Sequence, residues 1–241
     1  MGRQQWWWGR GLAAVAVLAV AGCTAIDDPA APEASDAKPS LSASASAGAE
    51  GGEADTGTLP GVPSAEQART ELAELKVAPH GSMSGYSRAK FPHWAELGED
   101  CNTRETVLER DGTGVTRDDE CRAVSGRWTS VYDDKTFTDA SDLDIDHMVP
   151  LANAWRSGAN TWTQVKRKAF ANDLTHPQLL AVSAASNRSK GDQGPDEWQP
   201  PSKPYWCTYA RAWVSVKSTY ELSVTENEKT TLTDMLGTCP S

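Results

Sequence analysis

The feature that most restricts the fold is a long segment near the N-terminus that lacks the side chains needed for a core. Residues 24–63 consist largely of Ala, Ser, Gly, Pro and acidic residues, and they are poor in aromatic side chains. Such a segment cannot bury enough apolar surface to offset the entropy lost on ordering. We therefore expect a disordered acidic tether over residues 23–63, and a folded domain in the residues that follow it.

The segment before the tether has the pattern of an export signal. Two arginines in the first ten residues precede an apolar run over residues 11–21, which is too short to span a bilayer comfortably. The run leads into VAGC at residues 20–23, which resembles a bacterial lipobox. That resemblance implies a signal peptide over residues 1–22 and lipidation of Cys23, which would anchor an exported chain on the extracytoplasmic side of a bacterial cell membrane. The alternative is an ordinary signal peptide with Cys23 unmodified.

Four cysteines remain if Cys23 carries lipid. An even number in an exported chain indicates two disulfides, and four cysteines allow 3 pairings. We favour Cys101–Cys121 with Cys207–Cys239, because each pair brackets one local segment. The chain has no Cys-x-x-Cys pair, which excludes a zinc finger or a thioredoxin-type site.

The charge is unevenly spread along the chain. The net charge of −10 argues against a protein that coats nucleic acid by overall attraction. Residues 24–60 contribute seven acids and one lysine, whereas residues 147–217 contain nine basic and four acidic side chains. The second half of the chain therefore offers a locally basic surface, which is typical of phosphate binding.

Helix and strand signals alternate after the tether. Ser64 and Thr225 each begin a capping box, and Gly237 suits the position that follows the last helix. A helix over residues 64–79 is expected to lead into the domain, and the aromatic stripe in residues 205–222 is expected to be core. Short strands are expected at residues 144–149 and 179–182, with Ser183 as the cap of a helix through residue 187.

Two segments contain the candidate metal ligands and the candidate general base. LDIDHMVPL at residues 143–151 places carboxylates in a strand-like stretch, where charges are disfavoured without a purpose. SNRSKGD at residues 186–192 follows the second expected strand. Carboxylate and amide oxygens suit a hard divalent cation, and a histidine with its ordinary pKa near 6.5 suits a general base.

These two segments, in this order, resemble the signature of the HNH endonuclease family, whose core is two strands and a helix around one metal ion. From about residue 86 to residue 239 the chain is similar to exported bacterial HNH proteins of the DUF1524 group, like the C-terminal part of GmrSD. The matching pieces include CNTR at 101–104, RD at 110–111, AWRSGA at 154–159, FANDL at 170–174 and DEW at 196–198. The resemblance implies an α+β fold, in which a ββα-metal core is embedded in a largely helical, disulfide-stabilised domain over residues 80–241.

The resemblance also implies roles for individual residues. His147 matches the general base, Asp146 the metal carboxylate and Asn187 the asparagine ligand, while Asn172 resembles the asparagine that fixes the backbone around the base. Neighbours in a strand face opposite ways, so Asp146 and His147 share a site only if the strand ends or bulges there. In a second interpretation Asp144 holds the metal, because it lies on the same strand face as Asp146.

Three basic residues are expected to contact substrate: Arg188 and Lys190 match positions near phosphate, and Arg104 is a further candidate. The implied activity is a membrane-anchored endonuclease that uses one Mg²⁺ or Mn²⁺ ion on nucleic acid, with DNA favoured over RNA. The alternative is a catalytically inactive nucleic-acid-binding lipoprotein with the same fold. A peptidase or another hydrolase lacks support, because the chain has no His-Glu-x-x-His motif and no nucleophile elbow.

Overall fold

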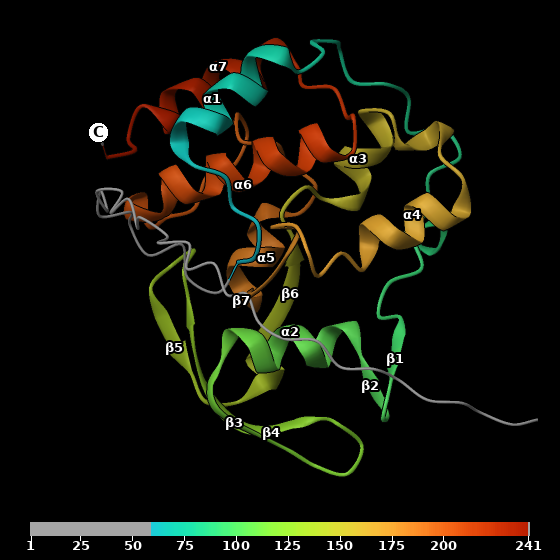
Figure 1. The fold of residues 1–241 in the computed structure, drawn as a ribbon, viewed down its shortest axis with the longest axis vertical. Coiled ribbons are helices and arrows are strands. Elements are labelled where there is room, and N and C mark those ends of the chain that lie inside the picture. Colours follow the sequence, from blue (N-terminus) through green and yellow to red (C-terminus); the bar gives the residue numbers. More distant parts are fainter. Residues whose placement is uncertain (1–58, 241) are drawn as a thin grey trace, which may run out of the picture. The chain divides into compact units, whose positions relative to one another are not determined.

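The computed structural model describes residues 59–240. The expected signal peptide, Cys23 and nearly all of the expected tether lie outside this range. Within it the chain is a mixture of helices and short antiparallel strands, so the α+β expectation is confirmed (Figure 1). No helix among these residues has the length and apolar character that a membrane crossing requires.

The elements follow one another in this order. The first half contains α1 (Ala65–Glu74), β1 (Glu96–Gly98), β2 (Cys101–Asn102), α2 (Thr103–Asp111), β3 (Thr113–Arg117), β4 (Ala123–Ser130) and β5 (Lys135–Phe137). The second half contains β6 (Leu143–His147), α3 (Leu151–Arg156), α4 (Gln164–Ala171), β7 (Leu179–Ser183), α5 (Ala184–Lys190), α6 (Trp206–Thr219) and α7 (Glu226–Leu236). Short 3-10 turns occur at Arg88–Lys90, Ala140–Asp142, Ala159–Thr161 and Lys203–Tyr205.

The strands β6 and β7 and the helix α5 form the expected ββα unit. The two strands pair antiparallel, with Asp146 opposite Leu180 and His147 opposite Leu179. Ser183 ends β7 and caps α5, since its hydroxyl accepts the backbone N–H of Ser186. The strand β6 ends at His147, which is the condition under which the last two residues of the strand can share a site.

Successive side chains of β6 and β7 point to opposite faces of the hairpin, and the two faces pack against two different hydrophobic clusters. On one face Leu143, Ile145, Leu179 and Ala181 pack with a small cluster around Trp128. On the other face of β7, the side chains of residues 180 and 182 join the main core beneath the helices. The acidic residues of β6 lie on the strand face opposite its apolar residues, so the hairpin presents its carboxylates towards α5.

The helices α1, α6 and α7 pack together over the main core (Figure 1). The aromatic stripe of α6 is core as expected, and Trp213 is fully buried. Thr225 and Glu228 form the complete capping box of α7. Gly237 directly follows the last residue of α7, as expected, and its backbone has a right-handed helical conformation. The helix α1 ends sooner than expected, at Glu74.

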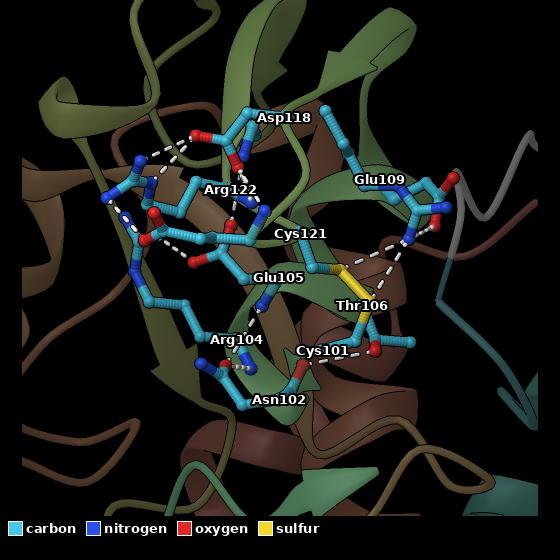
Figure 2. Close-up of a disulfide and its surroundings, with 12 residues drawn as sticks. Cys101, Asn102, Arg104, Glu105, Thr106, Glu109, Asp118, Cys121 and Arg122 are labelled. Atoms are coloured by element: carbon cyan, nitrogen blue, oxygen red, sulfur yellow. Dashed lines mark hydrogen bonds and ion pairs between the residues drawn. A yellow bond between two sulfur atoms is a disulfide. The ribbon is translucent and has the colours of Figure 1, made fainter. Parts of the chain in front are cut away.

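Both disulfides are present in the favoured pairing. Cys101–Cys121 joins β2 to the turn between β3 and β4, with the two Cα atoms 5.1 Å apart (Figure 2). Cys207–Cys239 joins the start of α6 to the chain after α7, with a Cα separation of 4.9 Å. The first bridge therefore fixes the entry to α2, and the second holds the C-terminal segment against the main core.

Candidate active site

A cavity of about 270 Å³ opens where β6 and α5 meet a loop from the N-terminal part of the described chain. Its walls include side chains from all three segments: Asp146 and His147 of β6, Asn187 and Arg188 of α5, and Tyr86 and Arg88 of the loop. Four of the residues expected in the site therefore line one cavity: Asp146, His147, Asn187 and Arg188.

Asp146 is held by two donors from elsewhere in the domain. It is 3% exposed, and its Oδ2 accepts hydrogen bonds from the Tyr132 hydroxyl and the Lys190 ammonium, each at 2.6 Å. No hydrogen bond to Oδ1 occurs among residues 59–240, so that oxygen is available to a ligand in the cavity. Burial, followed by the charge of Asp146, raises the pKa of Tyr132 well above its usual value, so the phenol stays protonated as a donor.

Lys190 is buried, although its position in the motif indicated a side chain that contacts phosphate. Its side chain has no exposed surface, and its ammonium donates to Asp146 Oδ2 and to the backbone oxygens of His147 and Met148. An ammonium has three donors, so all of them are in use. Lys190 thus fixes the end of β6 and the carboxylate of Asp146, and the expectation that it contacts phosphate is corrected.

His147 has its tautomer set by a backbone carbonyl. Its Nε2 lies 3.1 Å from the oxygen of Ala171, and because a carbonyl only accepts, Nε2 carries the proton. Nδ1 has no hydrogen-bond partner in the described part of the chain and is left with its lone pair. Burial lowers the pKa of His147 from 6.5 to about 3, with Arg88 adding a smaller effect, so the imidazole is neutral at physiological pH.

Asn172 holds in place the end of α4, where the Ala171 carbonyl accepts the hydrogen bond from His147. It follows Ala171 at the end of α4, and its Oδ1 accepts from the backbone of Ala95 at 2.8 Å and from the Thr103 hydroxyl at 2.9 Å. Its Nδ2 donates to the backbone oxygens of Pro92 and of residue 168. The side chain lies outside the cavity and ties three segments together next to the carbonyl that His147 contacts.

Asp144 and Asn187 lie together on the α5 side of β6. The amide Nδ2 of Asn187 donates to Asp144 Oδ2 at 3.1 Å, which leaves Asn187 Oδ1 without a partner among the described residues. Asp144 is not part of the cavity wall, whereas Asn187 is. Asp144 therefore orients the Asn187 amide. Asp146, which lines the cavity, is favoured over Asp144 as the carboxylate available to a ligand there.

The donor atoms around the cavity suit a small hard cation. Asp146 Oδ1 and Asn187 Oδ1 are both oxygens with no protein partner in residues 59–240. That part of the chain contains no group of three or more His, Cys, Asp or Glu side chains able to hold a metal ion. A site with one carboxylate and one amide fits Mg²⁺ or Mn²⁺, because Mg²⁺ usually keeps several waters and binds through one or two carboxylates plus substrate phosphate.

The remaining expected substrate contacts divide into two groups. Arg188 is exposed at the cavity wall, with its Nε 3.9 Å from Asp144 Oδ2. Arg104 does not line the cavity, because its guanidinium donates to Glu105 Oε1 at 2.8 Å and to the Ala140 carbonyl at 3.1 Å beside the first disulfide (Figure 2). Its role in this structure is to join α2 to the turn before β6, and the phosphate-contact expectation is corrected.

Three residues of the site lie in segments that the motif did not include: Tyr132, Arg88 and Trp94. The Trp94 ring centre is 5.9 Å from that of His147, and its backbone is left-handed with φ 59°. Such a conformation is unfavourable for a bulky residue, and it persists only where neighbours hold it. The bond from Ala95 to Asn172 is one such restraint. A sequence pattern gives no sign of these residues, apart from the abundance of tryptophan.

Comparison with known proteins identifies the family of the chain. The family model "GmrSD restriction endonucleases, C-terminal domain" matches residues 102–235. An uncharacterized secreted protein of the fungus Arthroderma benhamiae is 58% identical over 182 residues, which cover 76% of this chain and 89% of the relative. That relative is fungal, whereas the resemblance had pointed to bacterial proteins. No solved structure matches significantly. The chain therefore belongs to the family of the C-terminal domain of the GmrSD restriction endonucleases.

Proposed function

We propose that this protein is an endonuclease that hydrolyses phosphodiester bonds in nucleic acid, with His147 as the general base. The observation that carries the proposal is the cavity that combines the neutral His147 imidazole with oxygens of Asp146 and Asn187. Because Nε2 is occupied by the Ala171 carbonyl, Nδ1 is the atom that takes the proton from the attacking water.

Asp146 and Asn187 would hold one divalent ion, Mg²⁺ or Mn²⁺. When bound, such an ion neutralises charge on the scissile phosphate and on the departing oxygen. Tyr132 and Lys190 keep the Asp146 carboxylate in one orientation, and Asp144 does the same for the Asn187 amide. Arg188 supplies a guanidinium at the wall for the phosphate backbone. These assignments rest on the contacts above and on the family.

The test is cleavage of supercoiled plasmid DNA and of a matching RNA by the full chain, with Mg²⁺, with Mn²⁺ and with EDTA. We expect cleavage that needs the metal, with DNA as the better substrate. His147→Ala should lower the rate by roughly 10²–10⁴-fold, the usual contribution of a general base, while Mn²⁺ binding survives. Full activity in His147→Ala, or in EDTA, would contradict the mechanism. Binding of nucleic acid without any cleavage would favour the alternative, an inactive binding protein with the same fold.

We further propose that the protein works outside the cytoplasm. A secreted relative and two disulfides support export. The proposed lipid anchor depends on Cys23, which lies outside the described residues. Cell fractionation of the wild type and of Cys23→Ser tests it: the wild type is expected with the membrane and the variant in the medium. A wild type found wholly in the medium, with no acyl group by mass spectrometry, would overturn the anchor without affecting the nuclease proposal.

A further inference from the structure

The segment of the chain that precedes the family match contributes to the wall of the cavity. The match begins at residue 102, whereas Tyr86 and Arg88 lie in the loop between α1 and β1. Arg88 begins the 3-10 turn Arg88–Lys90, and its side chain is exposed. The cavity that holds His147 is therefore completed by residues outside the part of the chain that identifies the family.

The backbone on which Arg88 stands is held firmly against the domain. Phe91, three residues further on, is fully buried, and its ring centre lies 6.1 Å from that of Phe170. Arg167 Nε donates to the backbone oxygen of Lys90 at 3.1 Å. These contacts fix where the turn lies, so the Arg88 side chain starts from a defined position beside the cavity.

The charge of Arg88 has no counterpart among residues 59–240. The two acidic side chains of the cavity wall are already paired: Asp146 with Lys190 at 2.6 Å, and Asp192 with Arg156 at 3.0 Å. The guanidinium of Arg88 makes no hydrogen bond and no ion pair anywhere in residues 59–240. An arginine that lines a cavity and lacks an internal acid is suited to an anionic ligand, since its planar fork matches a phosphate.

We propose that Arg88 binds the phosphate backbone of the nucleic acid at this cavity, and with Arg188 forms a pair of guanidiniums at the scissile site. This inference rests on the proposed function, because it takes a phosphodiester as the ligand. The two arginines come from segments 100 residues apart in the sequence. Substrate binding thus depends on the loop before the family domain as well as on α5.

The experiment measures binding and cleavage separately. Fluorescence anisotropy with labelled DNA and RNA duplexes of one sequence, in the His147→Ala parent with EDTA, reports binding across a salt series. Adding Arg88→Ala should weaken binding by at least about fivefold at low salt, and lower the slope of log affinity against log salt by about 1. Arg88→Lys should keep the slope, because it keeps the charge, and should recover only part of the cleavage rate in the otherwise wild-type protein.

Arg127→Ala is the matched control. Arg127 is exposed on β4, away from the cavity wall, and its side chain likewise has no partner in residues 59–240. If the wild type cleaves and Arg88→Ala behaves like Arg127→Ala, this inference is wrong and the proposed function stands. If the wild type binds through Arg88 but does not cleave, the nuclease proposal fails and the phosphate site stands. A wild type that neither binds nor cleaves overturns both.

Discussion

The Nε2 atom of His147 lies 3.1 Å from the carbonyl oxygen of Ala171, at the last residue of α4. That single contact decides which nitrogen of the imidazole keeps its lone pair. Asn172 in turn holds the end of α4 to the loop that carries Trp94 and to the start of α2. The orientation of the imidazole is thus set by a helix end, while the strand β6 fixes the backbone of His147.

Asn172→Ala should lower the cleavage rate by about 10²-fold with little change in Mn²⁺ affinity, because a shift of the base by about 1 Å costs that much. The variant loses four hydrogen bonds, so melting temperature must be followed alongside the rate. Thr103→Val removes the hydrogen bonds of the Thr103 hydroxyl to Asn172 Oδ1 and to the Ala95 carbonyl, and should give a smaller loss of rate. Equal rates for the wild type and a folded Asn172→Ala would show that Asn172 is merely structural.

Asp146 and Asp144 can be distinguished by metal binding. Asp146→Asn keeps an oxygen acceptor for Tyr132 and Lys190 but removes the charge, and should weaken Mn²⁺ binding by at least about tenfold in calorimetry. Asp144→Asn should have a smaller effect, because Asp144 acts only on the Asn187 amide. The opposite ranking would make Asp144 the metal carboxylate.

Lys190→Met should destabilise the domain by roughly 3–5 kcal/mol, because it leaves the buried Asp146 carboxylate without its cation. Asp146→Asn in the same chain removes that charge, and part of the stability should return. Urea unfolding of the wild type, both single variants and the double variant gives the coupling between the two side chains. Losses that simply add would mean that the ion pair contributes no coupling energy.

Stability should fall as the pH drops from about 4.5 to about 2. Glu228 is buried, which by itself raises its pKa, but His80 and Lys217 more than compensate and lower that pKa from 4.5 to about 2. A carboxyl group whose pKa is lowered by folding stabilises the fold at pH values above its pKa in the unfolded state. This contribution is lost as the pH falls through its pKa in the folded state. The contribution is on the order of 3 kcal/mol.

This effect can be measured by following the melting temperature of Glu228→Gln as a function of pH. The melting temperature of this variant should fall less steeply than that of the wild type between about pH 4.5 and about pH 2. Glu226→Gln is the control, because Glu226 is exposed in the first turn of the same helix. If the two variants show the same dependence on pH as the wild type, the acid sensitivity arises elsewhere.

Local patterns predicted the elements whose signals lie within a few residues. The alternation of Leu143 and Ile145 with acidic residues located β6, and the hydroxyls of Ser183 and Thr225 located the starts of α5 and α7. The sheet β3–β4–β5 was not predicted, since polar and apolar residues are mixed on strands that are largely exposed on both faces.

The site was predictable only as far as its motif extends. Lysine is almost never fully buried, so nothing near Lys190 indicated that it would pair with an aspartate 44 residues away. Tyr132, Trp94 and Arg88 reach the site through tertiary packing, from segments with no motif of their own. Contacts of that kind depend on the folded arrangement, and a pattern of neighbouring residues does not contain them.

Because Asp146 and Lys190 neutralise each other inside the protein, losing the charge of either one alone leaves the other charge buried without its partner. This cost to stability would remain in a descendant that had lost the proposed activity. His147 is not constrained in this way, since its side chain makes one hydrogen bond, to a backbone carbonyl. Among descendants of this protein, we therefore expect loss of the proposed activity to be visible first as a substitution of His147, while Asp146 persists.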